Sequence, residues 1–167
     1  MAAAAPPEDL LREAARTLGE LASRFTAYAV GERDRYAGRR ADVPGRGQAL
    51  IPVITVDQED PYSTSARVSF GDYYLGGSGA AHGGAIPLVF DDLLGRLANA
   101  GGRRTSRTAY LTVSYRSITP IGRELRLEGR VDRQEGRKRF LTGRLFDGDT
   151  LCADAEALFV ELRPGQP

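Results

Sequence analysis

The chain has 167 residues, of which 41% are hydrophobic and 27% charged, and its net charge is +1. This composition is typical of a globular domain with a sizeable core, and the near-neutral charge favours neither a nucleic acid nor a membrane as partner. A single cysteine, Cys152, excludes an intramolecular disulfide, and no apolar run approaches the ~18 residues of a transmembrane helix. The segment before Pro6-Pro7 lacks basic residues, so we expect no signal peptide and a cytoplasmic location.

Residues 1–48 are predicted to form a tail, an amphipathic helix and a basic loop. Pro7-Glu8-Asp9 is typical of a helix start, because proline and acidic residues suit the first turn. Apolar residues then recur on one face, at Leu11, Ala14, Ala15, Leu18, Leu21, Ala22 and Phe25. The polar face is not enriched in Lys or Arg, which favours packing on the protein over a membrane surface. The arginine-rich segment 31–48 follows as a loop.

Residues 49–163 are predicted to form one α+β domain, in which a helix separates two strands from four more. The first two strands are expected at 51–56 and 65–70, followed by a flexible glycine-rich segment over 73–79. Later strands are expected at 108–116, 125–131, 140–146 and 151–162, with a polar turn over 133–139. Residues in 108–116 alternate, with Ala109, Leu111, Val113 and Tyr115 on one face. Thr108 has the opposite parity, so we expect it to point away from its own core.

The stretch from 81 to 100 carries most of the functional information. Its apolar residues recur at helical spacing, at Ile86, Val89, Phe90, Leu93, Leu94, Leu97 and Ala98. Pro87 fits only the first turn, so the helix should begin near Gly83 or Gly84, and it should be buried on most sides. Asp91 and Asp92 on such a helix need an explanation, because an unpaired carboxylate in a dry site is costly.

The start of this helix, His82-Gly83-Gly84, can present free backbone N–H groups to a developing negative oxygen. Asp91 lies roughly 12 Å further along the helix, too far for one small carbonyl to touch both. If both serve one reaction, they come from antiparallel helices of two chains. This predicts a homodimer with active sites at its interface, and a tetramer of two such dimers is left open.

His82-Gly83-Gly84 with Asp91 nine residues after the histidine resembles the signature of hotdog-fold acyl-CoA thioesterases of the PaaI-like family. The resemblance covers roughly residues 50–162 and includes Tyr73-Tyr74, the stretch 111–116 and Thr119-Pro120-Ile121-Gly122. It implies a hotdog fold, with a curved antiparallel sheet wrapped around one long buried helix. It also implies hydrolysis of an acyl-CoA thioester to a carboxylic acid and free CoA.

The resemblance also implies roles for individual residues. Asp91 would be the general base or the nucleophile, Gly83 with Gly84 would bind the oxyanion, and Thr108 would help to place the attacking water. His82 would either orient the turn or transfer a proton. Asp92 lies ~100° further round the helix and competes with Asp91 for the pocket, or it pairs with a nearby arginine such as Arg96 or Arg107.

The substrate's two ends would meet different residues. Tyr74 is a candidate for the acyl pocket, whereas Arg107, Arg137 and Lys138 are candidates for the CoA phosphates. Other arginines that could serve the phosphates are Arg103, Arg104, Arg139 and those of the 31–48 loop. No metal or redox cofactor is expected, because one histidine and one distant cysteine lack metal-ligand spacing.

Three positions depart from the family pattern. Gly76 stands where many relatives carry Asn or Gln, Gly95 stands where some carry a polar residue, and Pro87 is unusual inside this helix. The two glycines leave open a non-catalytic acyl-CoA-binding or regulatory hotdog protein. A hotdog enoyl-thioester hydratase or dehydratase is a further alternative, and it would need a histidine and an acid that converge on the α and β carbons.

Overall fold

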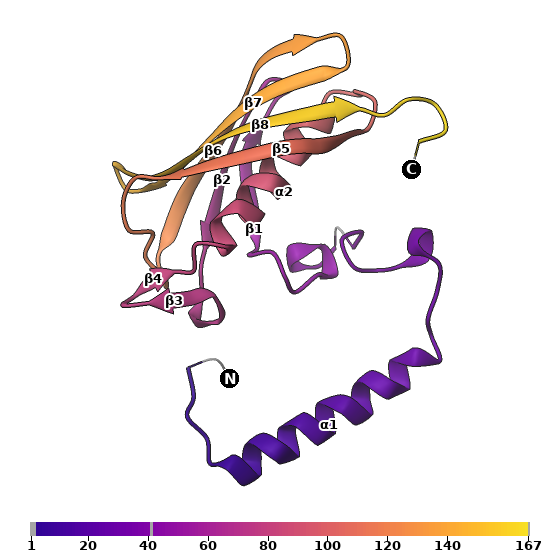
Figure 1. Ribbon diagram of the computed structural model, residues 1–167, viewed down its shortest axis with the longest axis vertical. Coiled ribbons are helices and arrows are strands. Elements are labelled where there is room, and N and C mark those ends of the chain that lie inside the picture. Colours follow the sequence, from indigo (N-terminus) through magenta and orange to yellow (C-terminus); the bar gives the residue numbers. More distant parts are fainter. Residues whose placement is uncertain (1–2, 41, 167) are drawn as a thin grey trace. The chain divides into compact units, whose positions relative to one another are not determined.

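The computed structural model describes residues 3–40 and 42–166, and the chain divides into two compact units, Met1–Gln48 and Ala49–Pro167 (Figure 1). The first unit contains the predicted helix, α1 (Glu8–Thr26), with Pro7 as its N-cap and acidic residues in its first turn. The segment expected to be a loop contains two short 3-10 helices, Glu32–Asp34 and Pro44–Gly47.

The second unit is a curved six-stranded antiparallel sheet that wraps around α2 (Ala85–Asn99) (Figure 1). The strand order is β1-β2-β6-β7-β8-β5, which places β5 at one edge. The strands are β1 (Ile54–Glu59), β2 (Ser63–Ser69), β5 (Ser106–Tyr115), β6 (Glu124–Glu135), β7 (Lys138–Asp147) and β8 (Thr150–Glu161). The predicted fold class and the order of these elements are therefore confirmed.

Two local predictions were wrong. The glycine-rich segment before His82 forms a 3-10 helix (Asp72–Tyr74) and a small hairpin of β3 (Leu75–Gly77) and β4 (Ala80–Ala81). The segment 133–139 is not a long polar turn, because β6 and β7 pair through it as far as Glu135 and Lys138. Only Gly136 and Arg137 connect the two strands, and Gly136 has the positive φ that such a tight turn requires.

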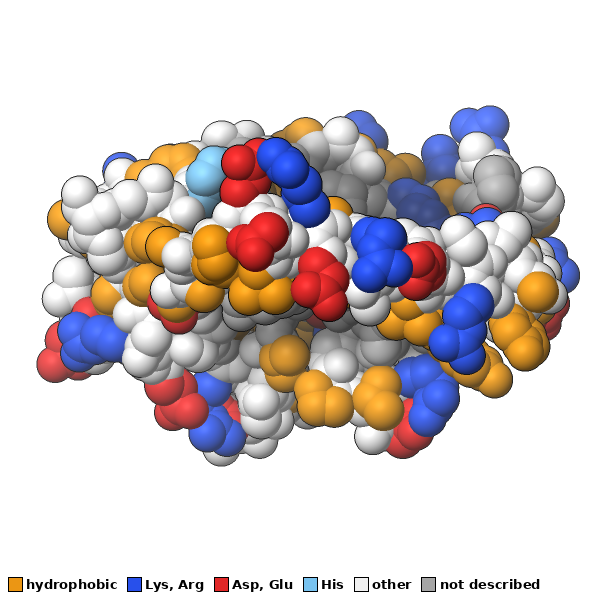
Figure 2. All heavy atoms as spheres, turned by 90° about the horizontal axis from the view of Figure 1, so that it is seen from below, with side chains coloured by type: hydrophobic (Ala, Val, Ile, Leu, Met, Phe, Trp, Pro, Cys, Tyr) orange, Lys and Arg blue, Asp and Glu red, His pale blue; other side chains and the backbone are white. Residues whose placement is uncertain are grey.

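Charged side chains of both signs are interspersed on the face of the molecule shown in Figure 2, with hydrophobic side chains between them. On the sheet, charged side chains pair across neighbouring strands, as Arg67 of β2 does with Asp57 of β1 and Glu124 of β6. Such exposed pairs add little stability. The mixed surface agrees with the net charge of +1.

Helix α2 packs on the inner face of the sheet through eight buried residues, Ala85, Ile86, Val89, Phe90, Leu93, Leu94, Leu97 and Ala98. Two sheet glycines allow this close approach. A Cβ at Gly143 would lie 2.8 Å from Cδ1 of Phe90, and one at Gly129 would lie 3.1 Å from Cδ2 of Leu94. The helix is buried on most sides, as predicted, since only Asp91 and Asn99 of its residues are exposed, and Asp91 lies on the strip that the sheet leaves open.

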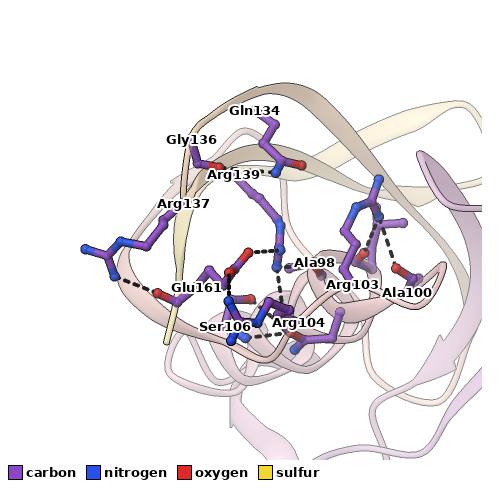
Figure 3. Close-up of polar contacts among 12 residues, drawn as sticks. Ala98, Ala100, Arg103, Arg104, Ser106, Gln134, Gly136, Arg137, Arg139 and Glu161 are labelled. Carbon is purple, nitrogen blue, oxygen red and sulfur yellow. Dashed lines mark hydrogen bonds and ion pairs between the residues drawn. The ribbon is translucent and has the colours of Figure 1, made fainter. Parts of the chain in front are cut away.

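The C-terminal end of α2 is held by a buried arginine (Figure 3). Arg139 of β7 is only 1% exposed, and its Nη1 donates hydrogen bonds of 3.0 Å to the carbonyl oxygens of Ala98 and Arg104. Its Nη2 pairs with Oε2 of Glu161 at 3.0 Å. Burial lowers the pKa of Arg139, and the Glu161 carboxylate opposes this shift. A cation here also complements the negative end of the helix dipole.

A second set of contacts joins the same helix end to β5. The side chain of Asn99 donates a hydrogen bond from Nδ2 to Gly95 O at 2.8 Å. Its Oδ1 accepts hydrogen bonds from the backbone N–H and the hydroxyl of Ser106, at 2.7 and 3.0 Å. Because Ser106 begins β5, these bonds fix the edge strand against the helix.

Gly143→Ala is expected to destabilise the domain by about 1–3 kcal/mol, because the new methyl group would overlap the ring of Phe90. Urea unfolding followed by circular dichroism measures this change. Gly71→Ala is the matched control, since a Cβ at Gly71 meets nothing within 4 Å. Equal stability of the two variants would contradict the close approach of α2.

Arg139→Met is expected to cost about 3–5 kcal/mol, because it leaves the largely buried Glu161 carboxylate without its main partner and two carbonyl oxygens without a donor. Arg104→Met removes a cation that is 67% exposed and lies 3.4 Å from Glu161, so a loss below about 1 kcal/mol is expected. The free energies of unfolding of the two variants should therefore differ clearly, and similar losses would argue against the buried pair.

Candidate active site

Asp91 lies on the exposed strip of α2, where β5 passes the helix. The Thr108 hydroxyl donates a hydrogen bond of 2.8 Å to Oδ1 of Asp91. Both residues are exposed in the single chain. Within residues 3–40 and 42–166, Oδ2 of Asp91 has no hydrogen-bond partner. The carboxylate is therefore oriented through one oxygen and can accept a proton at the other.

The contact of Thr108 with its own helix contradicts the orientation predicted from parity. Thr108 pairs with Phe159 of β8, and Tyr110 pairs with the adjacent Leu158, so Ala109 is the extra residue of a β-bulge. Phe159 is a buried core residue, and the bulge turns Thr108 toward the same inner side as Leu111. Simple alternation fails here because it assumes an unbroken strand.

The turn before α2 is held by three hydrogen bonds. The Gly84 N–H donates to Nδ1 of His82 at 3.0 Å, and the Ala85 N–H donates to the carbonyl oxygen of His82 at 2.8 Å. The Tyr115 hydroxyl donates to the carbonyl oxygen of Gly83 at 2.7 Å. Because Nδ1 of His82 accepts a hydrogen bond, the neutral ring carries its proton on Nε2.

These bonds leave one donor of the turn without an acceptor. In the described part of the chain, the N–H of Gly83 donates no hydrogen bond. The carbonyl of the same peptide points toward Ala85, so this N–H points away from the helix. Gly83, rather than Gly84, is thus the backbone group that is free to bind an oxyanion.

The departure at Gly76 has a steric reason. A Cβ at this position would lie 2.8 Å from the Cα of His82, because the β3–β4 hairpin packs directly against the turn. The same hairpin region holds His82 from the backbone, since the His82 N–H donates to the carbonyl oxygen of Tyr74 at 2.7 Å. A longer side chain at position 76 would require the His82 turn to shift.

Three other predicted residues lie around this region with different environments. Asp92 is half-buried, unlike the exposed Asp91, and Arg96 lies 3.7 Å from Glu59 of β1. The hydroxyl of Tyr74 donates to the carbonyl oxygen of Leu50 at 3.2 Å, and burial raises the pKa of this tyrosine. Thr108 contacts the Asp91 carboxylate directly.

Three cationic candidates for the CoA phosphates lie around one row of the sheet. Arg107 of β5 and Lys138 of β7 flank Val160 of β8 from opposite sides, so they share one row of the sheet. Arg107 points to the outer face, because Ser106 before it points inward to Asn99. Arg137 lies in the adjoining turn and donates to the Glu161 carbonyl oxygen at 2.7 Å.

Two more candidate arginines make hydrogen bonds within the fold. Arg139 is buried, as described above, and its guanidinium is not accessible to a ligand. Arg103 donates hydrogen bonds to the carbonyl oxygens of Pro61 and Ala100. The burial of Arg139 could have been recognised from the sequence, because Arg139 alternates with Leu141, Gly143 and Leu145, which are all buried.

The separation of Asp91 and Gly83 agrees with the estimate made from the sequence. Helix α2 begins at Ala85, so Asp91 lies about 9 Å along the axis from its first residue, and Gly83 precedes that residue. No group of three or more His, Cys, Asp or Glu side chains among the described residues could hold a metal ion. None of the described helices is long and apolar enough to cross a membrane.

Comparison with known proteins relates this geometry to thioesterases. Residues 78–153, which contain the turn, α2, β5 and β6, match the family model of the thioesterase superfamily. Acyl-coenzyme A thioesterase THEM4 of Xenopus laevis is 36% identical over 98 residues, which make up 56% of this chain and 43% of that protein. The match therefore spans less than half the length of this curated relative.

Solved structures agree over a larger part of the chain. The thioesterase superfamily protein RHA08564 is 28% identical and superposes with a TM-score of 0.77. The superposition covers 95% of this chain and 82% of that protein. The protein smu.793 of Streptococcus mutans UA159, solved with bound acetyl CoA, has a TM-score of 0.63 at 16% identity and shows the fold alone. It covers 68% of this chain and 92% of that one. In its sequence match over residues 78–153 and in its sheet wrapped around α2, this chain is similar to proteins of the thioesterase superfamily.

Proposed function

We propose that this protein hydrolyses acyl-CoA thioesters to a carboxylic acid and free CoA. The observation that carries the proposal is the 2.8 Å hydrogen bond between Thr108 and the exposed Asp91, in a chain that resembles acyl-coenzyme A thioesterases. The bound acetyl CoA of smu.793 supports a CoA ester as the ligand class. The spacing of His82-Gly83-Gly84 and Asp91 supports the PaaI-like type within the superfamily.

The reaction would proceed at the thioester carbonyl. Asp91 either takes a proton from a water that attacks the carbonyl carbon, or attacks that carbon itself to form an anhydride that water then cleaves. Thr108 holds the carboxylate through Oδ1 and leaves Oδ2 for this role. The Gly83 N–H stabilises the negative oxygen, the C–S bond breaks, and the thiolate leaves as CoA after protonation. Neither route needs a metal or a redox cofactor.

We further propose that the working unit is a homodimer. The carboxylate and the free N–H lie too far apart on one helix to reach the same carbonyl, and β5 has an unpaired outer edge in the sheet of the single chain. Two chains with antiparallel α2 helices would bring Asp91 of one chain to Gly83 of the other. Enclosure by a second chain would also shield the exposed Asp91 from bulk water.

On the outer side of the sheet, Arg107 and Lys138 would bind the CoA phosphates, with Arg137 of the adjoining turn. Tyr74, packed between Phe70 and Tyr73 beside the His82 turn, would border the acyl chain. Asp92 would form part of the same wall of the pocket. These assignments extend the proposal to the whole substrate.

Asp91→Asn is expected to lower kcat by ~10²–10⁴-fold, because it removes the proton acceptor or nucleophile and keeps the shape of the side chain. Short, long and aromatic acyl-CoA esters are tested by following free thiol release. Cys152 is fully buried and should add little background. Asp92→Asn separates the two neighbouring carboxylates, and Asp149→Asn in the β7–β8 turn is the control that should keep wild-type activity.

The outcomes of these assays distinguish the alternative roles and functions. A variant at Asp91 with full activity would contradict its role, and a loss confined to Asp92→Asn would transfer the role to Asp92. Binding of CoA esters without turnover of any ester would support a regulatory protein. Conversion of an enoyl-CoA to its hydrated product would support a hydratase.

The shared site is tested by complementation between two inactive chains. Gly83→Pro removes the free N–H, and a Cβ at Gly83 would meet nothing closer than the Tyr115 hydroxyl at 3.7 Å. Random pairing of Asp91→Asn and Gly83→Pro chains should restore about a quarter of the wild-type sites in a two-fold symmetric dimer. The activity of co-expressed chains measures this, with each variant alone as control. A mixture as inactive as its components would contradict a site shared between chains.

A further inference from the structure

We propose that Tyr115 is a positioning residue that holds the Gly83 turn in the conformation that binds the oxyanion; this inference rests on the proposed thioesterase function. Its hydroxyl donates a hydrogen bond of 2.7 Å to the carbonyl oxygen of Gly83. The ring also lies against the turn, since a Cβ at Gly83 would be 3.8 Å from its Cζ and 3.9 Å from its Cε1. Tyr115 therefore contacts the turn and not the reacting atoms.

The role follows from the hydrogen bonds of the two peptides on either side of Gly83. The first peptide is fixed by Ala85, whose N–H donates to the His82 carbonyl oxygen. The second peptide is fixed at both ends, because its N–H donates to Nδ1 of His82 and its carbonyl oxygen accepts from Tyr115. Without Tyr115, one end of the second peptide is released, and the N–H of Gly83 loses part of its orientation.

Tyr115 is well suited to hold this turn because its own backbone is anchored. It is the last residue of β5 and pairs with Ala153 of β8. The next two residues, Arg116 and Ser117, both donate backbone hydrogen bonds to the carbonyl oxygen of Cys152, at 2.8 and 3.1 Å. The hydroxyl therefore projects from a fixed strand end toward a turn whose two glycines have a backbone of high conformational freedom.

The same strand also orients the carboxylate, through Thr108. Preorganised donors contribute to catalysis because they need not reorient when charge develops in the transition state. Loss of the tyrosine hydroxyl should therefore affect kcat and leave substrate affinity almost unchanged. A residue that merely stabilises the fold would not produce this separation.

The test is Tyr115→Phe, which removes the hydroxyl and keeps the ring. We expect kcat for the best acyl-CoA ester to fall about 3- to 10-fold with KM unchanged within about twofold, as for the loss of one hydrogen bond. Tyr110→Phe is the matched control on the same strand, since Tyr110 pairs with Leu158 beyond the bulge and should keep wild-type kinetics. An unchanged kcat in Tyr115→Phe, with the wild type active, would overturn the inference alone.

A double-mutant cycle with Gly83→Pro shows whether Tyr115 acts through the turn. If it does, Tyr115→Phe should cost much less in the Gly83→Pro chain, which lacks the N–H, than in the wild type. Equal losses in both backgrounds would show that Tyr115 acts elsewhere and would overturn the inference. A wild-type chain that hydrolyses no acyl-CoA ester would overturn the proposed function, and this role of Tyr115 with it.

Discussion

The contact between α2 and the inner face of the sheet determines the rest of this structure. The helix can lie this close because Gly129 and Gly143 offer no side chain where Leu94 and Phe90 pack. Once the axis of α2 is fixed relative to the sheet, the distance of each helix residue from the sheet is fixed as well. The strip that contains Asp91 then meets β5 at hydrogen-bonding distance. The alignment of the carboxylate is thus a property of the core and not of a flexible loop.

The two ends of α2 are treated differently. At the C-terminal end, the carbonyl oxygens receive donors from Arg139, Arg103 and Asn99, so little polar capacity is left unused. At the N-terminal end, the turn is braced by side chains, but one N–H is left without an acceptor. The helix dipole favours an anion at that end. The C-terminal end therefore contributes stability, while the N-terminal end keeps a donor for the oxyanion of the proposed reaction.

The two helices, the order of the elements along the chain and the position of the functional stretch could be predicted from the sequence, because they depend on local periodicity and on the glycines around the helix. The orientation of Thr108 could not, since it depends on a bulge whose register is set by pairing with β8. The run from Arg137 to Arg139 was misleading for a different reason. Three consecutive cations suggest an exposed phosphate site, but strand alternation carries the third into the core beside Leu141.

The environment of Tyr115 could be predicted from the sequence only in part. Alternation with Leu111 and Val113 placed its side chain on the inner face, and the structure agrees. What the sequence did not reveal is that the strand ends under the His82 turn, so that the hydroxyl meets a backbone carbonyl and not the apolar core. This hydrogen bond depends on the path of the β3–β4 hairpin, which is difficult to predict from a glycine-rich sequence.

The bulge at Ala109 has a consequence for how related sequences should be compared. Thr108 and Tyr115 are an odd number of residues apart, so in an uninterrupted strand they would lie on opposite faces. The additional residue shifts the phase of the strand by one and brings both hydroxyls to the helix side. A homologue with a regular strand here would need an even separation between the two hydroxyls. A one-residue gap in an alignment of this strand would therefore indicate that the bulge is absent while both hydroxyls still lie on the helix side.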